Sequence, residues 1–279
     1  MKGFLKIISG AASMAMLAFA VSTVQAQLID VNFIDDSINT DYGGGNSPAP
    51  AAMSGAAVVG SAGDIWNGLS GFNYSSYPTG TTGGPYNLLY ANGTTSGATL
   101  SLTASSGTYD ANSVNWGNYS PFSWNSLADE QANTGYPATP YANLFASMIV
   151  SHTAGVVDTV TLSGLAPDGS YNLYVYSAGD LNLASGATPG QRTSTFSVNG
   201  ITQTCVWTSG VSTLVNGVDY LEFNAVADGS GMLVINYGNS ANGDETDFNG
   251  LQLQSVPEPG TFAMIGAAMT FFLVGRRNR

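Results

Sequence analysis

The sequence has few of the residue types on which most enzymes depend. Its 279 residues include a single cysteine, Cys205, and a single histidine, His152. One cysteine cannot form an internal disulfide, so an exported domain of this size would owe its stability to a hydrophobic core. Because Cys205 lies in a predicted strand, we expect it to be buried and structural. No Ser-His-Asp spacing, zinc motif or phosphate-binding loop is present, so the motifs do not indicate an enzyme.

Positive charge is also scarce in the central part of the chain. Of the six Lys and Arg residues, only Arg192 lies between residues 27 and 255, whereas every acidic residue except Glu258 lies there. A surface with this balance repels nucleic acid and anionic lipid. It favours cations, or uncharged partners such as polysaccharides.

The N-terminal segment, residues 1–26, has the three parts of a signal peptide. Lys2 and Lys6 supply the charged start, residues 7–21 supply the apolar middle, and Val24-Gln25-Ala26 is a small-residue cleavage site. We expect cleavage before Gln27 and export of residues 27–255 as one domain. That length is sufficient to bury a large core.

The C-terminal segment, residues 256–279, combines a Pro-Glu-Pro motif, an apolar run and a basic end. The prolines keep the motif out of regular helix, so we expect it to be extended and accessible. The apolar run of about 16 residues would form a helix of about 24 Å, which is short for a bilayer core of about 30 Å. The arginines would remain on the cytoplasmic side. The sequence predicts a marginal transmembrane segment, and an ordinary membrane anchor is the alternative.

This segment resembles the PEP-CTERM sorting signal of Gram-negative bacteria. The resemblance implies that an exosortase in the inner membrane recognises and removes the tail after transient insertion. It also implies that the protein is then passed to the cell surface or the extracellular matrix, including biofilm matrix. The matching residues are Pro257, Glu258, Pro259, Arg276, Arg277 and Arg279.

Between the two ends, short segments with alternating or continuous apolar residues predict an all-β protein, an antiparallel β-sandwich. Residues 28–34 alternate as in a half-buried strand, and we expect this first strand to lie beside the last one. Asn199-Gly200 predicts a two-residue hairpin. Ile65 and Trp66 are expected in the core, and residues 144–151 form a strand or a short helix. The other predicted strands cover residues 56–59, 99–104, 156–162, 171–176, 194–198, 201–207, 220–225, 232–237 and 249–254.

The later half resembles galactose-binding-like jelly-roll domains, which include malectin-like and other carbohydrate-binding modules. The similar stretches are residues 162–177, 196–200, 229–235 and 248–253, whereas no such similarity precedes about residue 150. The resemblance implies a jelly-roll sandwich. It also implies a structural calcium near the chain ends, without fixing its ligands.

Acidic residues crowd the first predicted strand and the loop before the last one. If these strands pair, their oxygens could meet, and calcium binds six to eight such ligands in irregular loops. The alternative is a set of solvated turn carboxylates. The candidate calcium ligands are Asp30, Asp35, Asp36, Asp244, Glu245 and Asp247.

The long segment 107–140 carries aromatic side chains among Asn, Ser and Gly. Exposed rings there would form a sugar-binding platform, whereas buried rings would fill the end of the core. Asp110, Asp129 and Glu130 also lie there, but any acidic domain offers such pairs, so a glycoside hydrolase is not favoured. We predict a non-enzymatic structural or adhesive surface protein, with a carbohydrate-binding module as the alternative. The platform candidates are Trp116, Tyr119, Trp124 and Tyr136.

Overall fold

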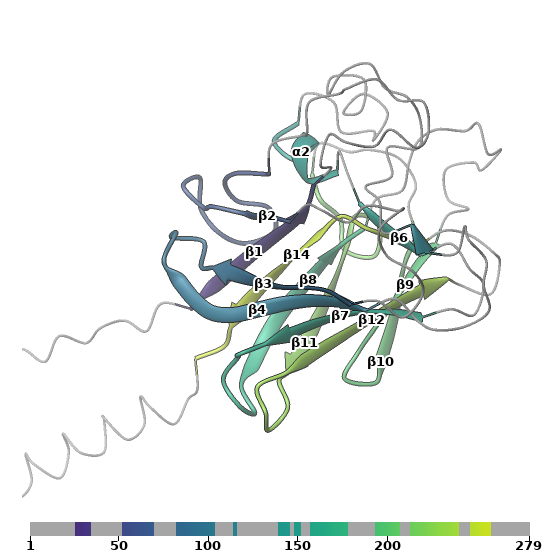
Figure 1. The fold of residues 1–279 in the computed structure, drawn as a ribbon. Helices are drawn as coiled ribbons and strands as arrows, with labels where there is room; N and C mark the ends of the chain where they lie inside the picture. Colours follow the sequence, from purple (N-terminus) through teal and green to yellow (C-terminus); the bar gives the residue numbers. More distant parts are fainter. Residues whose placement is uncertain are drawn as a thin grey trace, which may run out of the picture.

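Two β-sheets stacked face to face form the body of the protein, which confirms the predicted all-β sandwich (Figure 1). In the computed structural model, α2 (Ala142–Phe145) is the one helix of the described part. Within that part, no helix has the length and apolar character needed to cross a bilayer. The structure describes residues 26–34, 52–69, 82–103, 114–115, 139–145, 148–151, 157–177, 193–206, 213–239 and 246–257.

The first sheet has five strands and contains both ends of the sandwich. Its order is β11 (Tyr220–Val226), β8 (Ser170–Tyr176), β14 (Gly250–Ser255), β1 (Leu28–Phe33) and β2 (Asn67–Leu69). The neighbours are antiparallel, except that β2 runs parallel to β1. Strand β1 pairs with β14 in a register that places Asp30 opposite Gln252. The expectation that the first and last strands lie together is therefore confirmed.

The second sheet has six strands and faces the first across the core. Its order is β10 (Ile201–Val206), β9 (Thr193–Val198), β12 (Leu233–Asn239), β7 (Val157–Ser163), β4 (Thr95–Thr103) and β3 (Thr82–Leu89). Asn199 and Gly200 join β9 to β10 with φ angles of 50° and 77°, the left-handed values of the predicted hairpin turn. A small third sheet contains β13 (Thr246–Phe248), β6 (Ile149–Ser151) and β5 (Val114–Asn115).

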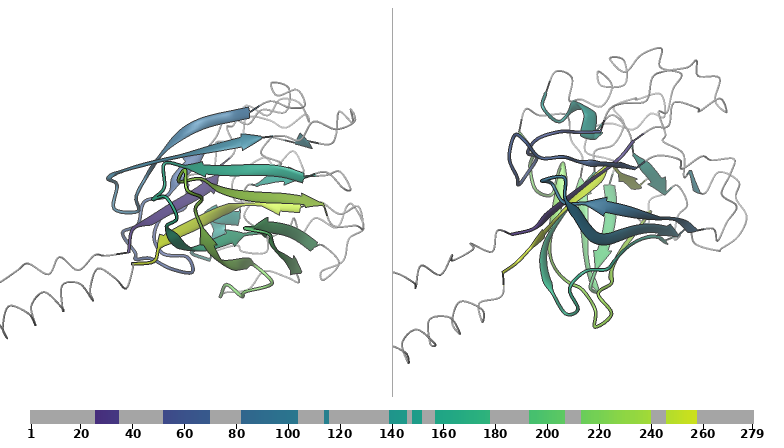
Figure 2. Two further views of the ribbon diagram at one scale, coloured as in Figure 1. Left: turned by 90° about the horizontal axis from the view of Figure 1, so that it is seen from below. Right: turned by 60° about the vertical axis from the view of Figure 1, so that its left-hand side comes forward.

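The main core lies between the two large sheets (Figure 2). Alternate residues of β1 and β14 point into it, and Leu100 and Leu102 of β4 meet them from the other sheet. Cys205 is 1% exposed, as expected for a structural cysteine. Burial raises the pKa of its thiol far above the ordinary value, so the thiolate is scarce at neutral pH.

The first sheet differs from the prediction because a second layer covers its outer face. The sequence predicts a half-buried β1, but all six of its residues are buried, including Asp30 and Asn32 on the outer face. The cover consists of residues 52–66 and α2, and it packs Met53, Trp66 and Phe145 against the tyrosines of β8. We refer to residues 52–66 as the covering segment.

The predicted strand at residues 56–59 is wrong, because these residues form bends within the covering segment. Their apolar side chains pack on the outer face of the first sheet, and these residues do not add a strand to it. The prediction for residues 65–66 is half correct: Trp66 is 4% exposed and buried, whereas Ile65 is 47% exposed. Residues 144–151 contain both alternatives, since α2 ends at Phe145 and β6 begins at Ile149.

Candidate functional site

The first and last described residues, Ala26 and Pro257, lie at the same end of the sandwich, which we call the pole. The backbone amide of Gln27 donates to Ser255 Oγ at 2.8 Å, and the amide of Ser255 donates to the carbonyl of Gln27 at 2.8 Å. The amide of Val256 donates to the carbonyl of Ser170 at 2.9 Å, and both Val256 and Pro257 are exposed. The sheet is thus complete at Ser255, and the predicted sorting motif begins outside it.

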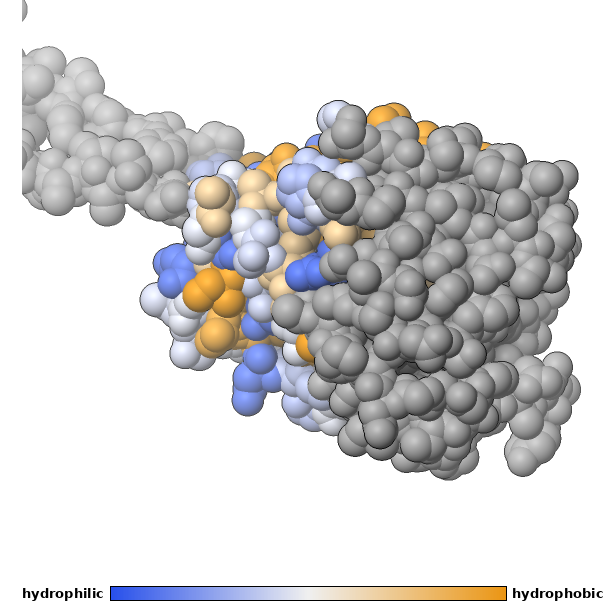
Figure 3. Space-filling model, turned by 90° about the horizontal axis from the view of Figure 1, so that it is seen from above, coloured by the Kyte–Doolittle hydropathy of each residue, from blue (hydrophilic) through white to orange (hydrophobic). Residues whose placement is uncertain are grey.

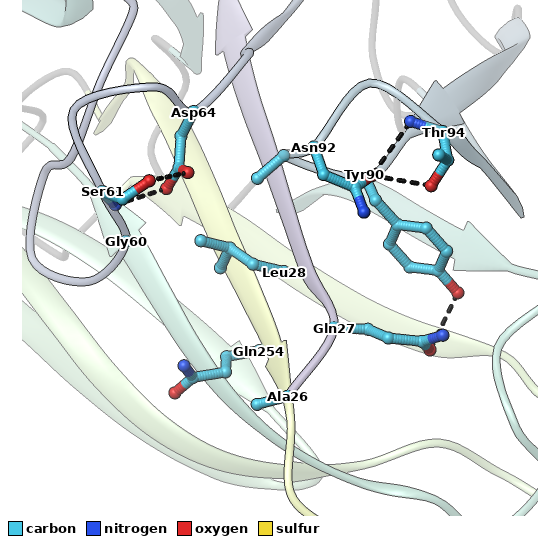
Figure 4. Close-up of a pocket in the computed structure, with 11 residues that line it drawn as sticks. Ala26, Gln27, Leu28, Gly60, Ser61, Asp64, Tyr90, Asn92, Thr94 and Gln254 are labelled. Carbon is cyan, nitrogen blue, oxygen red and sulfur yellow. Dashed lines mark hydrogen bonds between the residues drawn. The ribbon is translucent and has the colours of Figure 1, made fainter. Parts of the chain in front are cut away.

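A pocket of about 440 Å³ opens at the same pole (Figure 4). Four segments form its wall: the start of β1, the turn at residues 60–64, the hairpin between β3 and β4, and the end of β14. Its lining residues are Ala26, Gln27, Leu28, Gly60, Ser61, Asp64, Tyr90, Ala91, Asn92, Thr94 and Gln254.

Several polar groups of this pocket are already paired within its wall. The Asp64 carboxylate accepts hydrogen bonds from the amide of Ser61 at 2.7 Å and from its hydroxyl at 2.6 Å. Asn92 Oδ1 caps its own turn by accepting from the amide of Thr94 at 3.0 Å. The Tyr90 hydroxyl donates to Gln27 Oε1 at 2.9 Å. This pairing stabilises this end of the sandwich.

A buried polar network joins the covering segment to the first sheet. The Gln252 side chain donates to Asp30 Oδ1 at 2.8 Å and to the carbonyl of Val59 at 3.0 Å. Its oxygen accepts from the Tyr176 hydroxyl at 2.5 Å and from the amide of Val59 at 3.2 Å. The Tyr176 hydroxyl accepts in turn from the amide of Val58 at 3.1 Å. Every donor and acceptor of the Gln252 amide is therefore used.

Asp30 lies at the base of this network, and its side chain is completely buried. Burial raises the pKa of its carboxyl from 3.8 to about 7, the hydrogen bond from Gln252 opposes this, and the charge of Asp64 adds to it. Its Oδ2 atom makes no hydrogen bond with a described residue. Near neutral pH the protonated and ionised forms of Asp30 are therefore both present.

Asn32 is a second anchor for the cover, two residues further along β1. Its Nδ2 donates to the carbonyl of Leu144 in α2 at 3.2 Å and to that of Asn249 at 3.1 Å. Its Oδ1 accepts from the amide of Met53 at 3.1 Å. One side chain thus holds the sheet, α2 and the covering segment together. The sequence analysis missed the roles of Asn32 and Gln252, because polar residues that alternate along a strand ordinarily face water.

Two of the candidate calcium ligands lie within the described ranges. Asp30 is engaged with Gln252 under the covering segment. Asp247 is 1% exposed, and its backbone amide donates to Ser194 Oγ at 3.0 Å. The described ranges contain no group of three His, Cys, Asp or Glu side chains that could hold a metal ion. Asp35, Asp36, Asp244 and Glu245 lie outside the described residues, so the calcium site stays a prediction.

The other predicted sites fall almost wholly outside the described residues. Pro257 is the last described residue and is exposed. The view from above shows described residues of mixed hydropathy, without one broad apolar patch (Figure 3). Outside the described ranges are the aromatic residues Trp116, Tyr119, Trp124 and Tyr136, the acidic residues Asp110, Asp129 and Glu130, and the tail residues Glu258, Pro259, Arg276, Arg277 and Arg279.

No protein-family model and no curated protein matches the sequence. Among solved structures, the insecticidal crystal protein Cry2Aa is similar over 40% of this chain and 17% of its own, with 20% identity and a TM-score of 0.23. A ruminal GH26 endo-beta-1,4-mannanase is similar over 39% of this chain and 20% of its own, with 17% identity and a TM-score of 0.24. This chain spans at most a fifth of either protein, and these distant likenesses indicate no function.

Proposed function

We propose that the protein is an exported, non-enzymatic component of the cell surface or extracellular matrix of a Gram-negative bacterium. In this proposal a signal peptide, residues 1–26, directs export. The C-terminal segment, residues 256–279, holds the chain transiently in the inner membrane until an exosortase removes it. The remaining β-sandwich then serves a structural or adhesive role. We further propose that this sandwich is a jelly roll of the galactose-binding-like type, which the central pairing of β1 with β14 supports.

The observation that most supports this proposal is the position of the motif relative to β14. Strand β14 is hydrogen-bonded on one side to β1 and on the other to β8, and the last of the described bonds at this end is made by Val256. Pro257 follows and is exposed. Cleavage within or after the Pro-Glu-Pro motif would therefore remove no hydrogen bond of the sheet. The tail can be gripped and cut while the domain stays folded.

The non-enzymatic role is supported by the state of the reactive groups in the described part. The Cys205 thiol is buried with a raised pKa, and the polar side chains of the pole pocket largely pair with one another. Such groups stabilise a fold, whereas catalysis needs a nucleophile or an acid-base pair facing an open site.

The test is the intact mass of the protein recovered from the envelope and the medium of a host that has an exosortase. We expect wild-type protein without the terminal arginines. We expect the triple variant Pro257→Ala, Glu258→Ala, Pro259→Ala to keep its tail and to remain in the inner membrane. Pro167→Ala, at an exposed turn proline, is the matched control and should be processed normally. Stable wild-type protein that retains Arg279 would instead indicate an ordinary anchor.

A further inference from the structure

The outer face of the second sheet carries no charge, although the protein is strongly acidic. The net charge of the chain is -12, yet Asp158 is the only charged residue in the six strands of this sheet, and it is buried. We call the outward-facing side chains of β10, β9, β12, β7 and β4 the hydroxyl face, because most of them are Thr or Ser. Figure 2 shows β4, β7 and β12 side by side in the view from below.

The strand register arranges these side chains in rows across the sheet. One row crosses five strands and consists of Thr202, Ser197, Asn236, Thr159 and Thr103. Strands lie about 4.8 Å apart, so this row extends for roughly 19 Å. A second row contains Val234, Thr161 and Ser101, and a third contains Ser163 and Thr99.

Most hydroxyl groups of this face make no hydrogen bond with another described residue. The Thr159 hydroxyl bonds to Asn236 Oδ1 at 3.1 Å, and the hydroxyls of Thr195 and Thr204 lie 3.2 Å apart. Those of Ser101, Thr161 and Ser197 have no hydrogen-bond partner in the described part of the protein. Apolar surface lies among them, since Val157 is 50% exposed and Val234 is 40% exposed. The face therefore presents donors, acceptors and methyl groups together.

This chemistry restricts the kind of partner that could lie on the face. A second copy stacked sheet on sheet would need an apolar face, since two packed sheets interdigitate apolar side chains. An anionic polymer would be repelled by the acidic domain as a whole. A neutral polysaccharide has hydroxyl groups for the unengaged donors and acceptors, and C–H surfaces for the methyl groups. We propose that the hydroxyl face binds a neutral polysaccharide, laid across the strands.

This inference rests on the proposed function only in placing the protein where such polymers occur. It names a surface other than the aromatic residues of segment 107–140. Polysaccharide binding is measured on purified protein, whatever the state of its tail. The binding proposal can therefore fail while the sorting proposal holds, and the sorting proposal can fail while the binding proposal holds.

The test is depletion binding to a panel of insoluble neutral polysaccharides, including unsubstituted β-1,4-glucan, beside carboxymethylated β-1,4-glucan as a matched anionic polymer. We expect wild-type protein to bind at least one neutral member and not the carboxymethylated form. The double variant Thr159→Lys, Thr161→Lys should bind roughly tenfold more weakly. The control Ala62→Lys, Ser230→Lys adds the same charge at exposed turns off the face and should bind as wild type.

A conservative variant protects the test against misfolding. Thr161→Val keeps the shape of the side chain and removes its hydroxyl, so it should weaken binding while leaving the melting temperature almost unchanged. Failure of the wild type to bind any neutral member would overturn the proposal, as would equal binding by the face variants and the control. Loss of self-association in the lysine variant, without loss of polysaccharide binding, would assign the face to a second copy and contradict the proposal.

Discussion

The outer faces of the two sheets have the same alternating strand pattern, but much of the first face is buried and the second is partly exposed. On both, most of the outward-facing residues of the strands are polar. On the first sheet, Asp30, Asn32 and Gln252 are buried beneath the covering segment and α2, and Asn32 and Gln252 bond to that cover. On the second sheet the outward-facing polar residues are mostly Thr and Ser, such as Thr161 and Ser101, which are partly exposed and make few hydrogen bonds with other described residues.

The difference lies in what the side chains can reach. Amide and carboxyl groups of Asn, Gln and Asp extend far enough to pair with a passing backbone, whereas Thr and Ser hydroxyls remain close to their own strand. Buried polar groups need hydrogen-bond partners. The side-chain amides of Asn32 and Gln252 therefore fix where the covering segment and α2 lie on the sheet. The first face is therefore part of the fold, and the second is available for contact with other molecules.

Replacement of Gln252 should give the largest effect, because it removes the link between sheet and cover. Gln252→Leu leaves both backbone groups of Val59 and the Asp30 Oδ1 atom without a partner, and the Tyr176 hydroxyl without its acceptor, in a buried site. Each such group costs about 1–3 kcal/mol, so the free energy of unfolding should fall by about 5 kcal/mol. Urea unfolding would measure it. Gln254→Leu, on the same strand but only half-buried, is the control and should change stability by less than about 1 kcal/mol.

The pH dependence of stability should report the burial of Asp30. Its pKa is about 7 in the folded protein against an ordinary 3.8, so between these values the folded state binds more protons than the unfolded state. This contribution is fully present below about pH 4 and is lost as pH rises through 7. The raised pKa corresponds to about 4 kcal/mol.

The variant Asp30→Asn isolates this effect, because the neutral amide can still accept from Gln252 and does not titrate. Urea unfolding of wild type and variant at a series of pH values would give the two profiles. We expect the wild type to lose stability relative to the variant as pH rises from about 4 through about 7, and then to lose no more. Parallel profiles would show that Asp30 is not desolvated by the cover.

Trp66 contributes a smaller part of the attachment. Its Nε1 donates to the carbonyl of Gly55 at 2.8 Å, and its ring lies 6.1 Å from that of Tyr176. Trp66→Phe keeps an aromatic ring there but leaves a buried carbonyl without its donor, at a cost of about 1–2 kcal/mol. Thermal unfolding would detect it as a lower melting temperature. Tyr90→Phe removes a hydrogen bond at the exposed pole and should have the weaker effect, and equal effects would argue against a distinct role for the cover.

Local signals in the sequence were sufficient for the hairpin at Asn199 and for strands such as β4, β7, β8 and β14. They also placed the first strand beside the last. They failed where the outcome depends on distant residues. Strand β3 was not predicted, because it contains Gly83, Gly84 and Pro85, which are uncommon inside strands, although an edge strand tolerates proline.

The candidate sites were harder to predict because each assembles from separate segments. The pole pocket combines Gln27, Asp64 and Asn92, which no spacing rule connects. The network of Gln252 depends on a covering segment whose apolar residues at 56–59 suggest a strand. In the sequence, Asp30 and Thr161 are both polar residues within alternating strands. Among the described residues, the covering segment lies over Asp30 and not over Thr161, and this separates a titrating buried acid from a partly exposed hydroxyl.

The smallest expected effect on stability is that of a substitution on the second face, Thr161→Val. Thr161→Val removes a hydroxyl that has no partner in the described part of the protein and keeps the branched shape that suits a strand. Its free energy of unfolding should stay within about 0.5 kcal/mol of wild type, as is usual for surface changes. The same urea titrations that follow Gln252→Leu would measure it. If Thr161→Val instead destabilised the fold by about 2 kcal/mol or more, the hydroxyl would have a buried partner and the second face would be covered like the first.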